Sequence, residues 1–260
     1  MTQSLAFIHP DAKIGKNVVI EPFTTINKNV EIGEGTWISS NVTIMDGARI
    51  GKNCKIFPGA VISAIPQDLK FGGEESIARI GNHTTIRECV TINRGTSASG
   101  ETLVGDHCLL MAYSHVAHDC IIGNHCIIAN SVGIAGHVML GDYAILGGLC
   151  AVHQFVKIGA HSMISGGTLI RKDIPPYVKA AKEPVSFIGI NSIGLQRRGF
   201  SAKKISEVQK IYRKLFQSEK NISQAVTSIQ KAFDDSKEKK EILNFIKSSE
   251  RGLMKGYTSK

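Results

Sequence analysis

Residues 8–62 read IHPDAK IGKNVV IEPFTT INKNVE IGEGTW ISSNVT IMDGAR IGKNCK IFPGAV I, and an isoleucine heads every block of six. Large aliphatic residues continue in the same phase as far as Ile170. Of the 28 positions in this phase, only Asp68, Glu74 and Ala98 carry another kind of side chain. An internal repeat of this length indicates a solenoid, in which one structural unit recurs along the chain.

A period of six residues fits neither the 3.6-residue turn of an α-helix nor the two-residue alternation of a long strand. It fits short strands joined by tight corners, where each strand points one large and one small side chain inward. Three such strands make a coil of 18 residues, and coils stack at about the 4.8 Å spacing of neighbouring strands. The sequence therefore predicts a mainly β protein, a parallel β-helix with a ladder of aliphatic side chains in its core.

Five of the six cysteines share one place in the repeat, the fourth residue after the aliphatic one: Cys54, Cys108, Cys120, Cys126 and Cys150. Most other residues at this place are small or β-branched, so the position is expected to point inward. A free cysteine behaves there as a small hydrophobic residue. Neither disulfides nor cysteine zinc ligands are expected, because no two cysteines are separated by two residues.

Two segments, residues 63–79 and 96–102, keep the phase of the repeat but lose its pattern. Solenoids tolerate insertions at their corners, and such insertions commonly carry function, so both segments are expected to be protruding loops. The pattern stops after Ile170, and Pro175 and Pro176 end it with a rigid turn. We therefore expect a β-helix over residues 1–175 and a helical domain over residues 176–260, with one helix capped by Ser201.

The net charge of +9 is distributed unevenly. Residues 1–175 hold 13 Lys and Arg against 14 Asp and Glu, whereas residues 176–260 hold 18 against 8. Such a basic region attracts nucleic acid, a membrane surface, a phosphorylated ligand or an acidic protein, or it is a solvated helical surface. No signal peptide and no apolar run of about 20 residues is found, so we expect a cytoplasmic protein without an integral membrane segment.

Three histidines are expected along one edge of the solenoid, because their spacings are close to the 18-residue coil. His118 and His137 are 19 residues apart, and His137 and His153 are 16 residues apart. Histidine changes its charge near neutral pH and often serves as a general acid or base. This edge, which also includes His115, is therefore a candidate active site.

Zinc is the main alternative for these histidines. Solenoid zinc sites of the gamma-class carbonic anhydrases use two histidines five residues apart, and no such pair occurs in this chain. Zinc also needs ligands that converge on one point, so no metal is expected. Other histidines take the third place after the aliphatic residue, a corner that we expect to face solvent: His83, His107, His125 and His161.

Several motifs stand out against the repeat: 66–70 (PQDLK), 86–92 (IRECVTI), 117–120 (AHDC), 136–138 (GHV), 147–148 (GG), 151–155 (AVHQF), 173–177 (DIPPY) and 194–200 (GLQRRGF). The repeat resembles that of the hexapeptide-repeat acyltransferases, whose β-helix is left-handed, and the expected handedness rests on this resemblance. With its motifs, the chain is similar to the UDP-N-acetylglucosamine O-acyltransferases of lipid A biosynthesis. The likeness covers nearly the whole chain, including the helical tail.

The resemblance implies transfer of an (R)-3-hydroxyacyl chain from acyl carrier protein to the 3-hydroxyl of UDP-N-acetylglucosamine, the first step of lipid A biosynthesis. Such a transfer needs a base for the hydroxyl proton and a donor for the oxyanion. In the family's pattern, His118 is the general base, Asp119 orients it, and the backbone N–H of Gly136 stabilises the oxyanion. No cofactor is implied beyond the phosphopantetheine of the carrier protein, and no metal is implied.

The resemblance also assigns substrate contacts. It implies that the sugar and the acyl chain are contacted by Gln67, Asp68 and Lys70. It also implies that the nucleotide-sugar and acyl pocket is lined by His115, His137, His153 and Gln154. Nucleotide and phosphate contacts fall on Asn191, Arg197 and Arg198, and Gly166 is expected to leave room for a long acyl chain. Asn93 and Ile193 depart from the family, which commonly has His and Glu there.

The implied partners are acyl carrier protein, whose acidic surface suits the basic tail, and two further copies of the chain in a homotrimer, with no nucleic acid. Three alternatives stay open. The sister N-acyltransferase carries an extra N-terminal domain, for which repeats that begin at Ile8 leave no room. A coenzyme A-dependent acetyltransferase leaves Arg197 and Arg198 unexplained, and a non-catalytic scaffold needs no stacked histidines.

Overall fold

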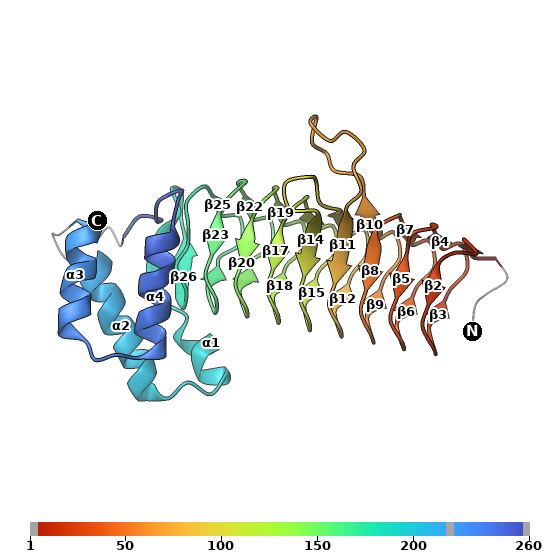
Figure 1. The fold of residues 1–260 in the computed structure, drawn as a ribbon. Coiled ribbons are helices and arrows are strands. Elements are labelled where there is room, and N and C mark those ends of the chain that lie inside the picture. Colours follow the sequence, from red (N-terminus) through yellow and green to blue (C-terminus); the bar gives the residue numbers. More distant parts are fainter. Residues whose placement is uncertain (1–4, 217–220, 257–260) are drawn as a thin grey trace.

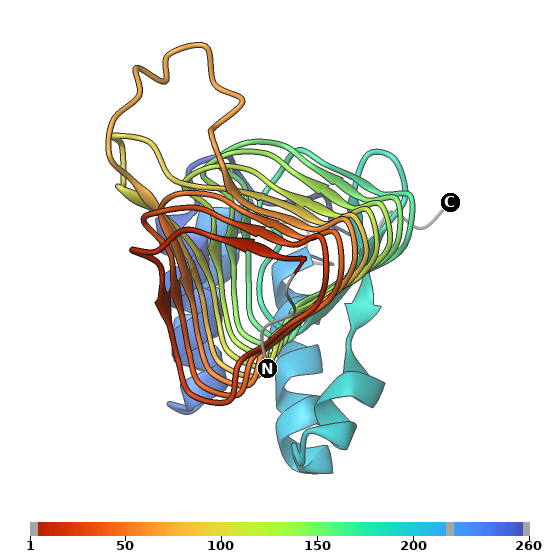
Figure 2. The same ribbon diagram turned by 90° about the vertical axis from the view of Figure 1, so that its right-hand side faces the viewer.

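The protein is described here by a computed structural model, which covers residues 5–216 and 221–256. Short strands wind into a three-sided prism, and a group of helices lies at its C-terminal end (Figures 1 and 2). Residues 217–220 and 257–260 of the expected helical region lie outside the described residues. Within these, each side of the prism is one sheet.

The first sheet contains β1 (Phe7–Ile8), β4 (Thr25–Ile26), β7 (Thr43–Ile44), β10 (Val61–Ala64), β13 (Thr91–Asn93), β16 (His115–Val116), β19 (Gly133–Ile134), β22 (Ala151–Val152) and β25 (Leu169–Ile170). The second contains β2 (Lys13–Ile14), β5 (Glu31–Ile32), β8 (Ala48–Ile50), β11 (Ile77–Ile80), β14 (Glu101–Val104), β17 (Ile121–Ile122), β20 (Met139–Leu140) and β23 (Lys157–Ile158). The third contains β3 (Val19–Ile20), β6 (Trp37–Ile38), β9 (Lys55–Ile56), β12 (Thr85–Ile86), β15 (Leu109–Leu110), β18 (Ile127–Ile128), β21 (Ile145–Leu146), β24 (Met163–Ile164), β26 (Val178–Ala181) and β27 (Ser186–Ile190).

Parallel pairing places equivalent residues of successive coils directly over one another. Ile128, for example, pairs with Leu110 on one side and Leu146 on the other, and all three are fully buried. Five cysteines are buried at the small inward position, and Cys89 is exposed. The predicted ladder of large and small inward side chains is confirmed, and its burial is the main favourable term in folding.

Two insertions explain why the repeat loses its pattern without losing its phase. The residues that pair between β10 and β13 are 30 apart rather than 18, which corresponds to 12 extra residues. The residues that pair between β11 and β14 are 24 apart, which corresponds to six extra residues. The lengths of both insertions are multiples of six, so the phase of the repeat is kept. Both insertions leave the prism at the corner between the first and second sheets (Figure 2).

The C-terminal region begins with strands rather than helices. β26 continues the third sheet beside β24, β27 pairs antiparallel with β26, and the first helix starts only at residue 192. The helices are α1 (Ser192–Arg197), α2 (Ala202–Phe216), α3 (Ile222–Ala232) and α4 (Lys237–Ser248). The hydroxyl of Ser201 accepts the N–H of Lys204 at 3.3 Å, as expected of a helix cap. Among the described helices, none is long and apolar enough to cross a membrane.

A column of stacked rings follows the corner between the second and third sheets: His83, His107, His125, Tyr143, His161 and Tyr177. The expectation that His161 faces solvent is wrong. Its ring is packed between Tyr143 and Tyr177, with Phe200 against it at 5.2 Å between ring centroids. Burial, followed by the positive charge of Arg198, lowers the pKa of His161 to about 4.

Candidate active site

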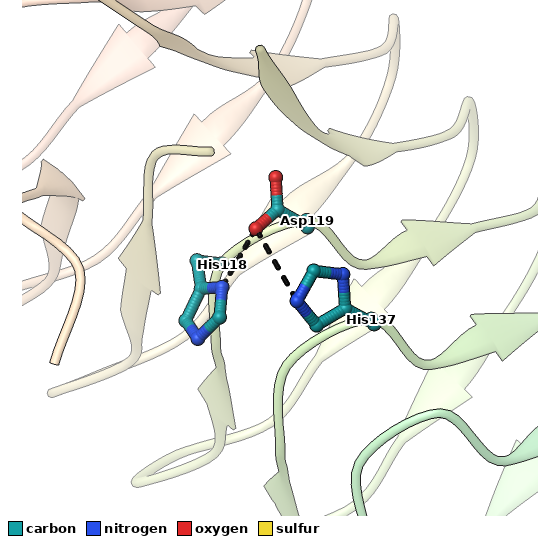
Figure 3. Close-up of side chains that lie close together, drawn as sticks. All are labelled: His118, Asp119 and His137. Atoms are coloured by element: carbon teal, nitrogen blue, oxygen red, sulfur yellow. Dashed lines mark hydrogen bonds and ion pairs between the residues drawn. The ribbon is translucent and has the colours of Figure 1, made fainter. Parts of the chain in front are cut away.

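His118 and Asp119 form a hydrogen-bonded pair at the corner between β16 and β17. The Nδ1 of His118 lies 2.7 Å from Oδ2 of Asp119 (Figure 3). The Asp119 side chain has no exposed surface, whereas 13% of the His118 side chain is exposed. The carboxylate is therefore buried, whereas the imidazole is partly exposed at the corner that also carries the two insertions.

The carboxylate of Asp119 accepts four hydrogen bonds. The N–H of Thr96 and the hydroxyl of Ser99 donate to Oδ1, and the hydroxyl of Thr96 and Nδ1 of His118 donate to Oδ2. Burial alone would raise the pKa of Asp119, but the bonds from Ser99, His118 and Thr96 outweigh burial and lower the pKa to about 2. Asp119 is therefore an anion near neutral pH.

Because Asp119 is ionised and can only accept, the proton of a neutral His118 imidazole belongs on Nδ1. Nε2 then keeps its lone pair, as a general base requires. A Cβ atom added to Gly136 would lie 2.7 Å from this Nε2 and 2.6 Å from Cε1. Any larger residue would displace the imidazole, so glycine is needed here for close approach.

The backbone N–H of Gly136 is available as a donor beside the imidazole. Gly136 is buried, its carbonyl accepts the N–H of Phe155 at 3.2 Å, and its own N–H has no hydrogen-bond partner within residues 5–216 and 221–256. An unpaired donor next to a free imidazole nitrogen is the arrangement that stabilises an oxyanion formed by general-base attack.

His137 lies one coil further along the same corner. Its Nε2 is 3.7 Å from Oδ2 of Asp119, and its ring is perpendicular to that of His118 at 5.1 Å between centroids (Figure 3). The other side of the His137 ring stacks on Phe155 at 4.5 Å. Phe155 was not singled out from the sequence, although its place, 18 residues after His137, would have identified it.

A second histidine shares the coil of His118. Nδ1 of His115 is 2.7 Å from the hydroxyl of Thr91, and burial, followed by the charge of His118, lowers the pKa of His115. The residue that pairs with His115 on the next coil is Gly133, and a Cβ added there would touch nothing within 4 Å. Open space therefore lies beside His115 on the outer face of the first sheet. His153, which is exposed, follows on the coil after that.

Three ligand atoms, one each from His118, Asp119 and His137, lie within 4.8 Å of one another. The sequence spacing did not suggest this cluster as a metal site. The residues nevertheless do not fit a resident metal, because the hydrogen bonds to Asp119 already occupy the roughly four lone-pair positions of a carboxylate. The 2.7 Å contact with His118 is itself the length of a charge-assisted hydrogen bond.

The expected sugar-contacting residues lie on the first insertion. Asp68 accepts the N–H of Lys70 at 3.0 Å through Oδ1, and the Gln67 side chain is exposed. At the base of this insertion, Nδ2 of Asn93 donates to the carbonyl of Ile65 at 3.1 Å, while its buried Oδ1 has no partner in the described chain. Asn93 therefore anchors the insertion and keeps one unused acceptor.

Gly166 lies at a different corner, between the third and first sheets. A Cβ there would come within 2.9 Å of the Gly148 carbonyl oxygen. Close approach of two coils is thus one reason for glycine at this position. The expectation that Gly166 leaves room for an acyl chain stays a prediction.

The expected nucleotide-binding residues lie at the corner between the second and third sheets, not at the corner of His118. Nδ2 of Asn191 donates to the carbonyl of His161 at 2.9 Å, and Arg198 donates to the carbonyl of Tyr143 at 3.2 Å. The Arg198 guanidinium also lies over the Tyr143 ring, 5.2 Å from its centroid. Arg197, at the end of α1, is exposed. Within one chain, these residues therefore lie at a different corner of the prism from His118 and Asp119.

Three family models match parts of the chain. One described as UDP N-acetylglucosamine O-acyltransferase, domain 2, matches residues 173–254, a bacterial transferase hexapeptide model matches residues 101–136, and one described as the GMPPB C-terminal domain matches residues 2–96. The acyl-[acyl-carrier-protein]–UDP-N-acetylglucosamine O-acyltransferase of Trichlorobacter lovleyi is 52% identical over 255 residues, which cover 96% of this chain and 98% of the relative. The enzyme of the same name from a Sulfurihydrogenibium species is 55% identical over 249 residues, which cover 95% of this chain and 92% of the relative.

Solved structures agree with these relatives. The UDP-N-acetylglucosamine acyltransferase of Bacteroides fragilis is 51% identical, with a TM-score of 0.97, over 98% of this chain and 100% of that one. The enzyme of Acinetobacter baumannii is 41% identical, with a TM-score of 0.95, over 98% and 99%. The predicted fold class, a left-handed parallel β-helix of hexapeptide repeats followed by helices, is confirmed.

Proposed function

Since the chain belongs to the acyl-[acyl-carrier-protein]–UDP-N-acetylglucosamine O-acyltransferase family, we propose that it transfers an (R)-3-hydroxyacyl chain to the 3-hydroxyl of UDP-N-acetylglucosamine, the first step of lipid A biosynthesis. The observation that carries the proposal is the free Nε2 of His118 beside the unpaired N–H of Gly136. Neither the sister N-acyltransferase nor a non-catalytic scaffold is favoured by the relatives.

The reaction follows from these groups. Nε2 of His118 takes the proton of the sugar hydroxyl as its oxygen attacks the thioester carbonyl carbon. The N–H of Gly136 donates to the oxyanion of the tetrahedral intermediate. The carbon–sulfur bond then breaks, and the imidazolium returns its proton to the departing thiolate of the carrier protein's phosphopantetheine. Asp119 stays ionised and stabilises the imidazolium. All the groups that this sequence of steps requires from the protein are side chains and a backbone N–H, so the proposal includes no cofactor.

Two further parts of the proposal concern partners and location. The C-terminal residues 176–260, with 18 Lys and Arg against 8 Asp and Glu, are suited to steer an acidic carrier protein to the site. The reaction is placed in the cytoplasm, where the six free cysteines of this chain would stay reduced.

The residues proposed to bind one substrate lie at two different corners of the prism, and this supports a homotrimer in which neighbouring chains share each site. His118 and Arg197 stand at different corners of one prism, but the corner of one copy can face another corner of its neighbour around a threefold axis. The third sheet also turns a row of large apolar residues outward: Leu109, Ile127, Ile145 and Met163. A row of this kind suits a contact between copies.

Mass spectrometry of UDP-N-acetylglucosamine incubated with 3-hydroxyacyl carrier proteins of several chain lengths tests the function. An ester on the sugar, formed only with carrier-bound donors, is the expected product, and the Gly166 prediction favours the longer chains. Donors carried on coenzyme A serve as the control. Failure to acylate the sugar with any donor would show that the solenoid has another function.

Replacement of Arg197 by alanine is expected to raise the KM for the nucleotide sugar about tenfold while kcat changes little. The reason is that a guanidinium-to-phosphate bond contributes equally to the ground state and the transition state. Steady-state kinetics with varied nucleotide sugar measure this. Lys16→Ala, the same loss of charge at the N-terminal end, is the control, and equal losses in kcat and kcat/KM would contradict a ground-state role.

The shared site is tested by mixing Arg197→Ala and His118→Ala chains during assembly. If a site takes His118 from one chain and Arg197 from the next, random trimers restore about one quarter of the wild-type sites. The assay uses nucleotide sugar well below its wild-type KM. Trimers mixed after assembly are the control, and mixed trimers no more active than their parents would place both residues in one chain's site.

A further inference from the structure

We propose that the second insertion, which lies within residues 94–100, is a clamp that fixes the Asp119 carboxylate, with Thr96 and Ser99 as positioning residues for His118. The proposal rests on the proposed function, because it gives these residues a part in the same reaction. Its basis is the geometry around Asp119, where three of the four hydrogen bonds come from this one insertion.

The clamp occupies both carboxylate oxygens. Thr96 holds Oδ1 through its N–H at 3.0 Å and Oδ2 through its hydroxyl at 2.8 Å, which fixes the plane of the carboxylate. Ser99 adds a bond to Oδ1. Only one lone-pair direction of Oδ2 is then left for His118, so the clamp determines where Nδ1 must lie and hence where Nε2 points.

The hydroxyl of Ser99 has two acceptors within reach and a single proton. The carbonyl of Glu101 lies at 2.9 Å and Oδ1 of Asp119 at 2.5 Å. A charged acceptor at the shorter distance makes the stronger bond, so the proton is directed to Asp119. Ser99 itself is exposed to solvent, and loss of its hydroxyl would leave no cavity in the core.

The clamp is braced against the first insertion. Glu74 accepts the N–H of Ser97 at 2.9 Å, and the hydroxyl of Ser76 donates to the carbonyl of Gly95 at 2.6 Å. The N–H of Ile77 donates to the carbonyl of Gly100 at 3.0 Å. Six additional residues between β13 and β14 thus supply donors for Asp119 and an attachment for the neighbouring insertion.

The test compares hydroxyl-deleting variants with hydroxyl-retaining ones. Ser99→Ala and Thr96→Val are each expected to lower kcat roughly tenfold, the equivalent of one lost bond to a charged group, with the KM of both substrates unchanged. Ser99→Thr and Thr96→Ser are expected to restore most of the rate. Ser40→Ala, which removes a corner hydroxyl without a hydrogen-bond partner in the described chain, is the matched control.

A second readout does not depend on activity. With fewer competing donors, the carboxylate of Asp119 accepts more strongly from Nδ1 of His118, so the proton resonance of this Nδ1–H is expected to move downfield in Ser99→Ala. Histidine-selective ¹⁵N spectra measure this, and His137, the other titratable group facing Asp119 at 3.7 Å, is followed alongside. If Ser99→Ala shows this downfield shift while the wild-type protein has no transferase activity, the clamp stands and the proposed function is rejected.

The clamp is overturned if both hydroxyl-deleting variants stay within twofold of the wild-type kcat and leave the Nδ1–H resonance of His118 unmoved. It is also overturned if kcat falls only in proportion to lost folded protein, measured by circular dichroism. That outcome would leave Thr96 and Ser99 with a structural role alone.

Discussion

Replacement of His118 by alanine is expected to lower kcat by at least about 100-fold, the smaller end of the usual effect of a positioned general base. Nδ1 of this imidazole is committed to Asp119 at 2.7 Å, so Nε2 is the group that the variant removes from the reaction. The N–H of Gly136 stays in place, and both substrates can still bind. Steady-state kinetics should therefore show a loss in kcat with KM values near those of the wild type.

His83→Asn is the matched control for this variant. It removes an imidazole from the exposed end of the ring column, at a backbone φ of +56° that asparagine adopts readily. Its kcat is expected to equal that of the wild type. Equal turnover by His118→Ala would leave the reaction in place but would take the role of base away from His118.

Much of the fold follows from the aliphatic repeat alone, because a six-residue period has few structural solutions. The inward positions, from Ile20 to Ile170, are those that the repeat marks. Handedness does not follow from spacing and rested on the resemblance. The two insertions were recognisable only as losses of pattern, since their lengths of 12 and six residues leave the phase intact. The strands β26 and β27 lie outside the repeat, so its pattern did not predict them.

The candidate site was partly predictable for the same reason. The 18-residue coil places His118 and Gly136 directly over one another, and a Cβ on Gly136 would strike the imidazole. Thr96 and Ser99 were not predicted, because they belong to an insertion, and nothing periodic governs how an insertion folds back. The corner at which Arg197 lies was likewise not predicted, since a sequence motif does not show at which corner of the prism a residue lies.

Replacement of Ile128 by alanine is expected to cost about 2–5 kcal/mol in free energy of unfolding, the usual range for a large aliphatic residue in a core. Ile128 is fully buried and lies between Leu110 and Leu146 in the ladder. Both neighbouring coils are held by their own backbone hydrogen bonds, so the space left behind cannot close by local collapse. Chemical denaturation at one fixed protein concentration measures the loss, because subunit association also contributes to stability.

Ile14→Ala is the comparison that tests whether the stability lost on truncation depends on the position of a residue along the ladder. It occupies the same place in the repeat, but it pairs only with Ile32 and is partly exposed at the open end of the prism. In a solenoid each unit contacts its nearest neighbours, so a terminal residue has about half the partners of a central one. Ile14→Ala should therefore cost about half as much as Ile128→Ala, or less. Equal losses at the two positions would contradict this nearest-neighbour account of the ladder.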